Sequence, residues 1–258
     1  MAVIAGNWKM HMDPAETRRF FDELSLEGPA GDQELLIFPP SISLVAAAEA
    51  AGRDARVQLG VQNIHWEDRG AFTGEISAPM AATAGASFVL IGHSERRHVF
   101  GETNEEVARK VDAARRHDLV PVVCLGETLD ERKAGRVEEV VLRQLDAVLP
   151  SLASGEARFL IAYEPVWAIG TGETATPDDA SAAHRTLRRR LGEAGGGGLA
   201  DEVAILYGGS VKPDNAAELL SAEGVDGVLV GGASLDPVSF AAIARWQAVD
   251  THSGLSDV

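Results

Sequence analysis

Short apolar segments alternate with longer amphipathic segments along almost the whole chain. The apolar runs are rich in branched residues, which is typical of strands, and the segments between them repeat with the period of helices. Eight strands are predicted, over residues 2–8, 35–38, 57–62, 88–93, 120–125, 159–164, 203–207 and 228–230. Because a helical pattern follows each of them, the strands are expected to form a parallel sheet.

Several of the predicted helices begin with a recognisable N-terminal cap. Asp13, Thr103, Thr176 and Asp236 each stand at the start of a helical pattern, where a side-chain oxygen can accept hydrogen bonds from the first turn. Helices are predicted over residues 14–24, 41–51, 78–84, 104–117, 129–149, 177–193, 215–221 and from residue 237 onward. The four glycines at 195–198 are predicted to form a flexible linker before the next strand.

Eight strand–helix units in 258 residues fit a closed (β/α)8 barrel of the α/β class. We predict a single domain over residues 1–249 and a disordered polar tail over residues 250–258. A doubly wound open sheet is the alternative. It usually has fewer strands, and no glycine-rich dinucleotide-binding turn follows the first strand of this chain.

Charge and composition argue against two classes of binding partner, nucleic acids and membranes. The formal net charge of −16 argues against binding to nucleic acid, which selects basic surfaces. No apolar run is long enough to span a membrane, and the first residues lack the basic region of a signal peptide. The single cysteine, Cys124, excludes an intrachain disulfide and fits a reducing cytosol. We therefore expect a cytoplasmic protein without a membrane or nucleic-acid partner.

One carboxylate stands at the root of an unusually apolar loop. Glu164 ends the sixth predicted strand, Pro165 follows it, and an apolar run then leads to glycines at 170 and 172. Exposed loops are normally polar, so this one is interpreted as a lid. A carboxylate beneath an apolar cover is a suitable general base. A structural glutamate before a tight turn explains this segment equally well.

Polar side chains follow several other predicted strands, and the carboxyl ends of all strands meet at one face of a barrel. They are Asn7, Lys9, His93, Ser94, Glu95, Cys124 and Glu127. A cation, an imidazole and a carboxylate would thus converge on one face, which predicts an active site there. Lys9 is either an electrostatic clamp or a Schiff-base nucleophile. His93 would lie at a helix N-terminus, which favours the neutral imidazole, although a structural histidine is the alternative.

Glycine pairs follow the last two predicted strands, at 208–209 and 231–232. Without side chains, backbone N–H groups can approach an anion, and this architecture commonly binds phosphate there. Glycine pairs are also common in simple tight turns. No metal is expected, because none of the seven histidines is spaced three or four residues from another.

Five segments together resemble the triosephosphate isomerase family. They are residues 7–10 (NWKM), 92–97 (GHSERR), 162–172 (AYEPVWAIGTG), 207–211 (YGGSV) and 230–235 (VGGASL). The resemblance extends from about residue 3 to 246 and identifies the fold as a TIM barrel. It implies that the protein interconverts dihydroxyacetone phosphate and D-glyceraldehyde 3-phosphate through an enediol(ate), with no cofactor. The triose phosphates would then be its substrates.

The resemblance also implies roles for single residues. Glu164 would be the base, His93 the group that polarises the carbonyl, and Lys9 and Asn7 the stabilisers of enediolate charge. The substrate-binding residues would be Asn7, Lys9, Gly170, Ser210, Gly231 and Gly232. Supporting and lid residues would be Glu95, Ser94, Cys124, Glu127, Trp167 and Tyr207. A homodimer is implied through the loop that begins at Asn63 and ends at Glu75, with Thr73 near the neighbour's Lys9.

The chain departs from the family pattern at three positions. Glu173 replaces a common lysine at the far hinge of the lid, Phe38 is bulkier than usual, and Ala204 stands where arginine is common. These departures put lid motion and local packing in question rather than the reaction. A Schiff-base aldolase that uses Lys9 and a catalytically inactive scaffold are the competing interpretations.

Overall fold

The computed structural model describes residues 2–26, 33–52, 56–152, 158–169 and 175–246. Eight parallel strands follow one another around a closed barrel, and β8 pairs with β1 to complete it. The strands are β1 (Val3–Asn7), β2 (Glu34–Phe38), β3 (Val57–Val61), β4 (Phe88–Ile91), β5 (Val120–Leu125), β6 (Leu160–Tyr163), β7 (Ala204–Tyr207) and β8 (Gly227–Val230). The predicted barrel is confirmed. The predicted tail at 250–258 lies outside the described residues.

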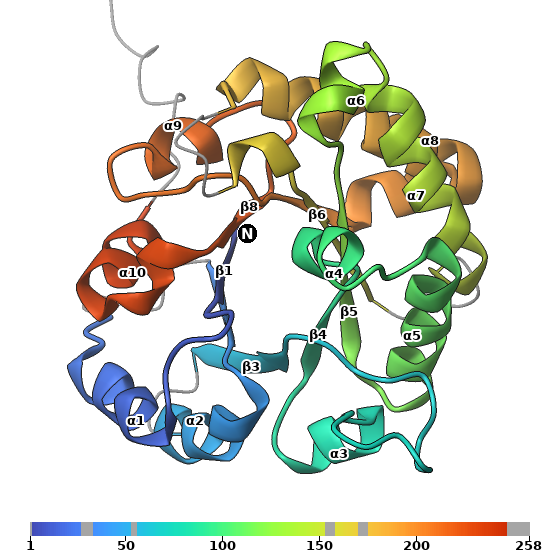
Figure 1. Ribbon diagram of the computed structural model, residues 1–258. Helices are drawn as coiled ribbons and strands as arrows, with labels where there is room; N and C mark the ends of the chain where they lie inside the picture. The colour runs from blue at the N-terminus through green and yellow to red at the C-terminus, as the bar shows by residue number, and fades with distance from the viewer. Residues whose placement is uncertain (1, 27–32, 53–55, 153–157, 170–174, 247–258) are drawn as a thin grey trace, which may run out of the picture.

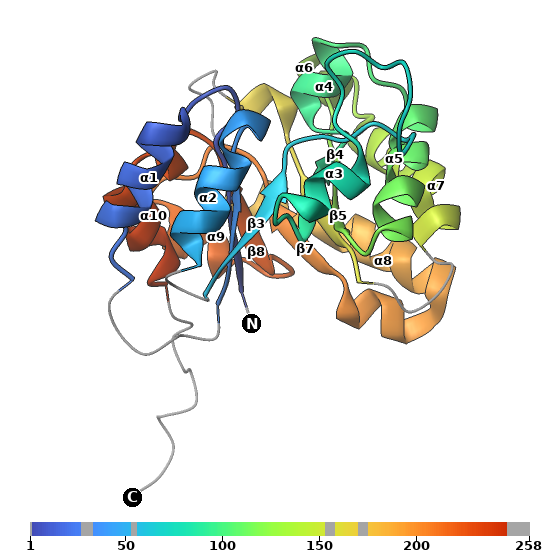
Figure 2. The same ribbon diagram turned by 90° about the horizontal axis from the view of Figure 1, so that it is seen from below.

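Helices surround the barrel on its outside (Figure 1). They are α1 (Pro14–Glu23), α2 (Leu44–Ala51), α3 (Ala78–Thr83), α4 (Ser94–His98), α5 (Asn104–Arg116), α6 (Leu129–Lys133), α7 (Val137–Leu152), α8 (Pro177–Glu202), α9 (Ala216–Leu220) and α10 (Pro237–Ala244). Three short 3-10 helices are η1 (Ser41–Ser43), η2 (Val166–Ala168) and η3 (Gly232–Leu235). Figure 2 shows that α4 and α6 lie at one end of the barrel, opposite the end where the chain begins.

The caps that the sequence predicted are present. The carboxylate of Asp13 accepts hydrogen bonds from the N–H groups of Ala15 and Glu16 at 2.8 Å. Thr103 and Thr176 cap α5 and α8 in the same way, and Asp236 caps α10. These side chains satisfy backbone donors that have no partner within the helix, and they define where each helix begins.

Alternation along the strands divides the buried side chains into two layers. On β2, Leu36 and Phe38 face the barrel interior, whereas Leu35 and Ile37 face the helices. The interior layer is Val3, Ala5, Leu36, Phe38, Phe88, Leu90, Val122, Cys124, Leu160, Ala162, Leu206 and Leu229. The barrel interior is therefore filled with side chains and does not form a channel. A ligand is expected to bind at the carboxyl ends of the strands.

Phe38, one of the departures from the family pattern, is accommodated by a glycine on the neighbouring strand. A Cβ atom placed on Gly60 would lie 2.2 Å from the ring of Phe38. The missing side chain on β3 thus provides the room for the large ring on β2. Ala204, another departure, begins β7 and is partly buried against the interior layer.

The helical patterns predicted over residues 129–149 form two helices, which Gly135 separates by adopting a φ of 68° between α6 and α7. The glycines at 195–198 are not a linker, since the backbone stays helical through them within α8. A Cβ atom on Gly192 would nevertheless lie 3.5 Å from that of Ala200, whereas eight residues span about 12 Å in a straight helix. The helix therefore bends sharply at these glycines.

Within the described residues, no helix combines the length and the apolar character that crossing a membrane requires.

His184 joins α8 to the loop before β8. Its Nδ1 lies 2.9 Å from the carbonyl oxygen of Gly224, and its ring packs edge-on against Tyr163. Burial is the main cause that lowers the pKa of His184 to about 4. Its Nε2 has no hydrogen-bond partner among the described residues. The folded protein therefore holds this imidazole neutral.

We predict that His184 makes the protein sensitive to acid. Because its pKa is lower in the folded than in the unfolded state, protonation favours unfolding, and stability is lost as pH falls from about 6.5 toward 4. Between pH 7.5 and 5 this one group is expected to remove about 2 kcal/mol from the free energy of unfolding. Urea denaturation at both pH values measures it. The variant His184→Gln should be less stable at pH 7.5 but lose less on acidification, and an equal loss in both proteins would contradict the prediction.

Candidate active site

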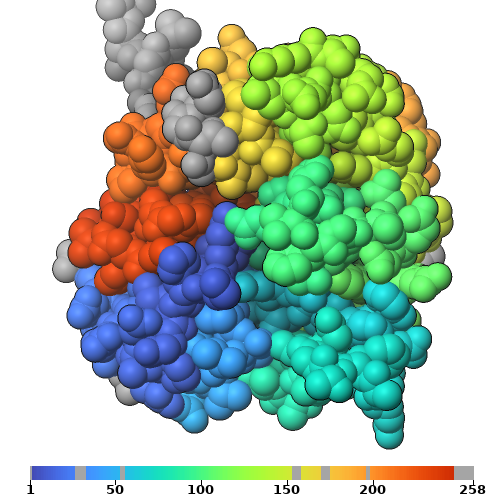
Figure 3. Space-filling view, viewed as in Figure 1, coloured from blue at the N-terminus to red at the C-terminus, as the bar shows by residue number. Residues whose placement is uncertain are grey.

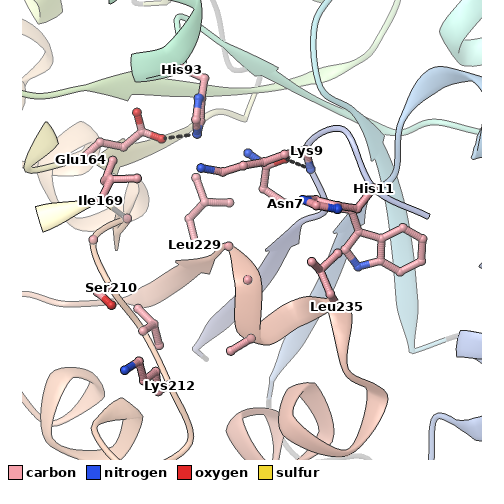
Figure 4. A pocket seen from close by; sticks show the side chains of 17 residues that line it. Asn7, Lys9, His11, His93, Glu164, Ile169, Ser210, Lys212, Leu229 and Leu235 are labelled. Atoms are coloured by element: carbon pink, nitrogen blue, oxygen red, sulfur yellow. Dashed lines mark hydrogen bonds and ion pairs between the residues drawn. The ribbon is translucent and has the colours of Figure 1, made fainter. Parts of the chain in front are cut away.

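A cavity of about 290 Å³ opens at the carboxyl ends of the strands. Figure 3 shows this face hollowed at its centre, between the segment after β1, α4 and the C-terminal part of the barrel. Residues that follow β1, β4, β6, β7 and β8 line the cavity, among them Asn7, Lys9, His93, Glu164 and Ser210. The predicted convergence of side chains from separate strand ends is thus present in the fold (Figure 4).

Glu164 is almost fully buried at the wall of this cavity. Its backbone N–H donates to Leu125 O at 2.7 Å, which continues the pairing of β6 with β5. The backbone N–H of Ser94 donates to Glu164 Oε2 at 2.7 Å. Glu164 Oε1 lies 3.1 Å from His93 Nε2, but the angles are not those of a hydrogen bond, and Oε1 has no other partner among the described residues. One carboxylate oxygen is therefore held and the other remains available.

Glycines on both neighbouring strand ends allow Glu164 to take this position. A Cβ atom on Gly126 would lie 1.7 Å from the carbonyl oxygen of Glu164, and one on Gly208 would lie 2.9 Å from its Cγ. Gly208 belonged to a predicted glycine pair, whereas Gly126 was not singled out by the sequence. Its place directly after the fifth predicted strand was the available signal.

His93 lies at the N-terminus of α4, as the sequence predicted. Its Nδ1 accepts a hydrogen bond from Glu95 N at 3.2 Å, so Nδ1 carries no proton. The proton of the neutral ring is thereby assigned to Nε2, which faces Glu164. The histidine can thus present an N–H donor to a ligand in the cavity.

Lys9 lies at the rim of the cavity in an ion pair with Glu95, Nζ to Oε1 at 2.6 Å. Its backbone has a φ of 51°, which is uncommon for a residue with a side chain. Two contacts hold that conformation: Lys9 N donates to Asn7 Oδ1 at 3.0 Å, and Gln62 Nε2 donates to Lys9 O at 2.8 Å. Gln62 was not among the predicted site residues, because a glutamine at a strand end carries no distinctive pattern.

The glycine-rich turns after β7 and β8 border the same cavity through Ser210, Gly231 and Gly232. A Cβ atom on Gly232 would meet nothing within 4 Å, and one on Gly231 would meet only Lys9 Cε at 3.8 Å. Packing therefore does not require glycine at either position. The turn after β8 instead leaves open space beside its backbone at the cavity, which is suitable for an anion. Gly170, the other predicted contact, lies outside the described residues.

A buried carboxylate anchors the segment after Glu164. Glu127 accepts hydrogen bonds from the Tyr163 hydroxyl at 3.0 Å and from Trp167 Nε1 at 2.8 Å. Burial is the main cause that raises the pKa of Glu127. The guanidinium of Arg132 stacks over the Trp167 ring at 4.3 Å and pairs with Asp179 at 2.7 Å. These contacts hold one end of the apolar run, whereas the other end, which includes Glu173, lies outside the described residues.

Two further predicted residues, Cys124 on β5 and Tyr207 on β7, are fully buried. Cys124 is fully buried in the barrel interior, and burial followed by the charge of Glu164 raises the pKa of its thiol well above the usual value. A thiol of this kind stays protonated and unreactive. Burial also raises the pKa of the Tyr207 hydroxyl to about 12. The Tyr207 hydroxyl fills the space beside Gly209, where a Cβ atom would lie 2.1 Å away.

Two apolar side chains complete the site: Ile169 from the predicted lid, and Leu229, which the sequence did not assign to the site. Ile169 and Leu229 line the cavity together with Glu164 and His93 (Figure 4). Leu229 follows from the alternation of β8, but its contact with a ligand site could only be seen once the barrel was closed. In the part of the chain that the structure describes, no group of three or more histidine, cysteine or acidic side chains is arranged to hold a metal ion.

Comparison with known sequences gives one consistent result. The sequence model described as triosephosphate isomerase matches residues 2–247. The chain belongs to the triosephosphate isomerase family. It is 50% identical over 246 residues to the triosephosphate isomerase of Solibacter usitatus, a match that covers 95% of this chain and 98% of the relative. It is 49% identical over 245 residues to that of Moorella thermoacetica, with coverage of 95% and 98%. It is 52% identical over 244 residues to that of Halorhodospira halophila, with coverage of 93% and 96%.

The region that matches the triosephosphate isomerase family includes every strand and all residues that line the cavity. The matched residues, 2–247, include all five segments on which the resemblance was based. The relatives are matched over nearly their full length, so the comparison concerns a complete barrel rather than one shared segment.

We predict that the substitution Gly126→Ala destabilises the protein and displaces Glu164. The added methyl group would overlap the carbonyl oxygen of Glu164 at 1.7 Å, so the ends of β5 and β6 have to separate. A loss of about 3 kcal/mol in the free energy of unfolding is expected, from overpacking together with broken strand hydrogen bonds. Chemical denaturation measures it. Gly232→Ala is the control, because its methyl group meets nothing within 4 Å, and equal stability of the two variants would contradict the interpretation.

Proposed function

We propose that this protein interconverts dihydroxyacetone phosphate and D-glyceraldehyde 3-phosphate by proton transfer through an enediol(ate), in glycolysis and gluconeogenesis. The observation that carries the proposal is the meeting of a carboxylate and an imidazole N–H, Glu164 Oε1 and His93 Nε2, 3.1 Å apart in a cavity. A base and a hydrogen-bond donor at that separation can act on adjacent atoms of one small substrate. Family membership supports the same reaction.

Glu164 is the proposed base. Its Oε1 has no hydrogen-bond partner among the described residues, so this oxygen can take the proton from C1 of dihydroxyacetone phosphate and return it to C2. The carboxylate ends the cycle in the state in which it began. Since one molecule both loses and regains the proton, the reaction needs no oxidant, metal or cofactor.

His93 is the proposed donor to the substrate oxygens. Its Nδ1 is occupied as an acceptor by Glu95 N, so the ring presents Nε2–H toward the cavity. This N–H can polarise the carbonyl as the adjacent carbon loses its proton. Exchange of the proton with the developing oxyanion then moves it between the two substrate oxygens.

Lys9 and Asn7 are the proposed stabilisers of negative charge. The Lys9 ammonium lies at the cavity rim, and Asn7 is buried beneath it at the end of β1. Glu95 fixes the direction of the Lys9 side chain through the 2.6 Å ion pair. A preorganised cation stabilises an enediolate without reorganisation of solvent.

The phosphate group is proposed to bind to backbone N–H groups of Ser210, Gly231 and Gly232, together with Gly170. Such a grip needs no cationic side chain, which suits a protein with a net charge of −16. The apolar run after Pro165 is proposed to close as a lid over the intermediate and keep water from it. Glu127, Trp167 and Tyr207 support that segment, and Ser94 and Cys124 lie beside Glu164.

The two competing interpretations are weaker. An aldolase would need Lys9 Nζ free to attack a carbonyl, whereas Nζ is engaged in the 2.6 Å ion pair with Glu95. An inactive scaffold would not need Asn7, Lys9, His93 and Glu164 to line one cavity. Borohydride treatment in the presence of substrate distinguishes an aldolase from an isomerase, because only the Schiff base of an aldolase is trapped as a covalent adduct.

We further propose that the protein is a cytoplasmic homodimer, assembled through the loop of residues 63–75. Apolar side chains are unusually exposed on the face that carries this loop: Met10, Phe72, Val99 and Phe100. Met10 and Phe100 line a second cavity of about 340 Å³ that reaches Lys9 and His93, and a partner's loop tip at Thr73 would fill it. The loop projects at the lower right of Figure 3. A large apolar patch on one face favours association.

We predict that the protein isomerises triose phosphates and that Glu164→Asp reduces kcat by roughly 100-fold, because the shorter side chain withdraws the base by about 1 Å. A coupled spectrophotometric assay measures both. The matched control is Glu193→Asp on the exposed surface of α8, which should keep full activity. Absence of turnover by the unmodified protein would refute the proposed function, and full activity of Glu164→Asp would refute the assignment of the base.

We predict that Thr73→Arg yields monomers with at least about tenfold lower kcat/KM, because the long, charged side chain would not fit beside the partner's Lys9, where the proposed interface places residue 73. Sedimentation velocity measures the assembly state. Ala217→Arg, on the exposed surface of α9, is the control and should leave both properties unchanged. An unmodified protein that sediments as a monomer would contradict the proposed dimer.

A further inference from the structure

Arg97, in α4, places a guanidinium beneath the active-site mouth without a carboxylate partner. Its Nε donates to Gly92 O at 2.7 Å, its Nη1 to Asn104 Oδ1 at 2.7 Å and its Nη2 to Cys124 O at 3.1 Å. All three acceptors are neutral. Within the described parts of the chain, no acidic side chain forms an ion pair with it, although its neighbour Arg96 pairs with Glu102 at 2.8 Å.

Keeping this charge in a partly buried position costs free energy. Burial is the main cause that lowers the pKa of Arg97, and the charges of Glu102 and Glu164 offset only part of that effect. An arginine side chain does not lose its proton in proteins, so the guanidinium stays charged. Since a partly buried charge without a carboxylate partner is a poor choice for stability alone, the position of Arg97 calls for another explanation.

Two of the three hydrogen bonds connect the ends of two neighbouring strands. Gly92 O belongs to the peptide unit that leads into His93, directly after β4, and Cys124 O belongs to β5. Arg97 N also donates to His93 O at 3.1 Å, so Arg97 contacts this turn through its backbone as well. Figures 1 and 2 show α4 placed over the ends of β4 and β5. The guanidinium therefore fixes the turn at residues 92–94 against the adjacent strand.

Gly92 makes this arrangement possible. Its φ of 73° lies in the left-handed region that favours glycine. A Cβ atom at this position would lie 2.7 Å from Arg97 Nη2 and 3.1 Å from its Cζ. The glycine before the histidine thus serves both the turn and the guanidinium that lies against it.

We propose that Arg97 is a positioning residue for the isomerisation, acting through His93 and Ser94. Both groups that meet the Glu164 carboxylate come from the turn that Arg97 holds: His93 Nε2 at 3.1 Å from Oε1 and Ser94 N at 2.7 Å from Oε2. The inference rests on the proposed function of this cavity. A displacement of the turn by about 1 Å is enough to reduce a rate by roughly 100-fold.

The planar fork of arginine is what the position requires. Its donors point in three directions at fixed angles, and here they reach three acceptors that come from β5, α5 and the turn after β4. A lysine keeps the charge but presents its donors from one nitrogen. A glutamine removes the charge and retains two donors. The two substitutions therefore separate the contribution of charge from that of geometry.

The test compares Arg97→Gln, Arg97→Lys and the surface control Arg185→Gln, whose partner Glu223 is exposed. For each protein, kcat and KM for the triose phosphates are measured on samples that share the circular dichroism spectrum of the unmodified enzyme. In parallel, ¹⁵N NMR of histidine-labelled protein reports the tautomer of the His93 ring, which is assigned by its loss in His93→Gln.

Arg97→Gln is expected to lower kcat by at least about tenfold with KM changed less than about threefold, and Arg97→Lys to recover part of the loss. The His93 ring should be a single Nε2–H tautomer in the unmodified enzyme and in Arg185→Gln, and a mixture of tautomers in Arg97→Gln. A folded Arg97→Gln with kcat within twofold and unchanged His93 signals would overturn the proposal.

Two other outcomes are also decisive. If Arg97→Gln does not fold, Arg97→Lys carries the test, and an unchanged kcat and unchanged His93 signals in that variant overturn the proposal. If the unmodified protein shows no turnover, the proposed function fails. The tautomer comparison then decides the role of Arg97 alone: altered His93 signals in the variants support positioning, and unaltered signals refute it.

Discussion

The hydrogen bond from Ser94 N to Glu164 Oε2 is the contact on which the site depends. It joins the end of β4 to the end of β6 across the intervening strand, β5. A carboxylate that is almost fully buried needs donors that do not move, and a backbone N–H at a strand end is such a donor. The glycine at 126 on the strand between them allows the approach, since any side chain there would overlap Glu164. Strand pairing, the backbone of the turn after β4 and one missing side chain thus determine where the carboxylate lies.

The packed interior of the barrel determines where a ligand can bind. Alternate side chains of the strands close the centre, so a ligand can bind only where the strands end. The same closure keeps Cys124 beneath the site as a neutral thiol. Different strand ends then contribute different chemistry: a cation after β1, an imidazole after β4, a carboxylate after β6 and glycine-rich turns after β7 and β8. No single segment of the chain contains more than one of these elements.

The features of this arrangement that could be predicted are those that produce a pattern within a short stretch of sequence. Apolar periodicity and capping residues predicted the strands and most helix starts, because both features act within a few residues. Glu164, His93 and Lys9 could be found since each directly follows an apolar run. Gln62, Gly126 and Leu229 could not, because their importance comes from neighbours on other strands. The glycines at 195–198 were predicted to be a linker from composition alone, but the backbone stays helical through them. Arg188, before the glycines, donates a hydrogen bond to the carbonyl oxygen of Ala200, after them, and no local pattern predicts such a contact.

The fit of Phe38 against Gly60 has a consequence for how this barrel can change. A ring on β2 occupies the volume that a side chain on β3 would need, so neither position is free to vary while the other stays as it is. A smaller residue at 38 leaves a cavity in the barrel interior, and any larger residue at 60 collides with the ring. The two positions are therefore coupled, because a larger residue at 60 requires a smaller one at 38. Such an exchange also has to move the backbone carbonyl oxygen of Phe88 on β4, which lies 2.9 Å from the position of a Cβ atom on Gly60. Engineering at position 60 must therefore repack both neighbouring strands.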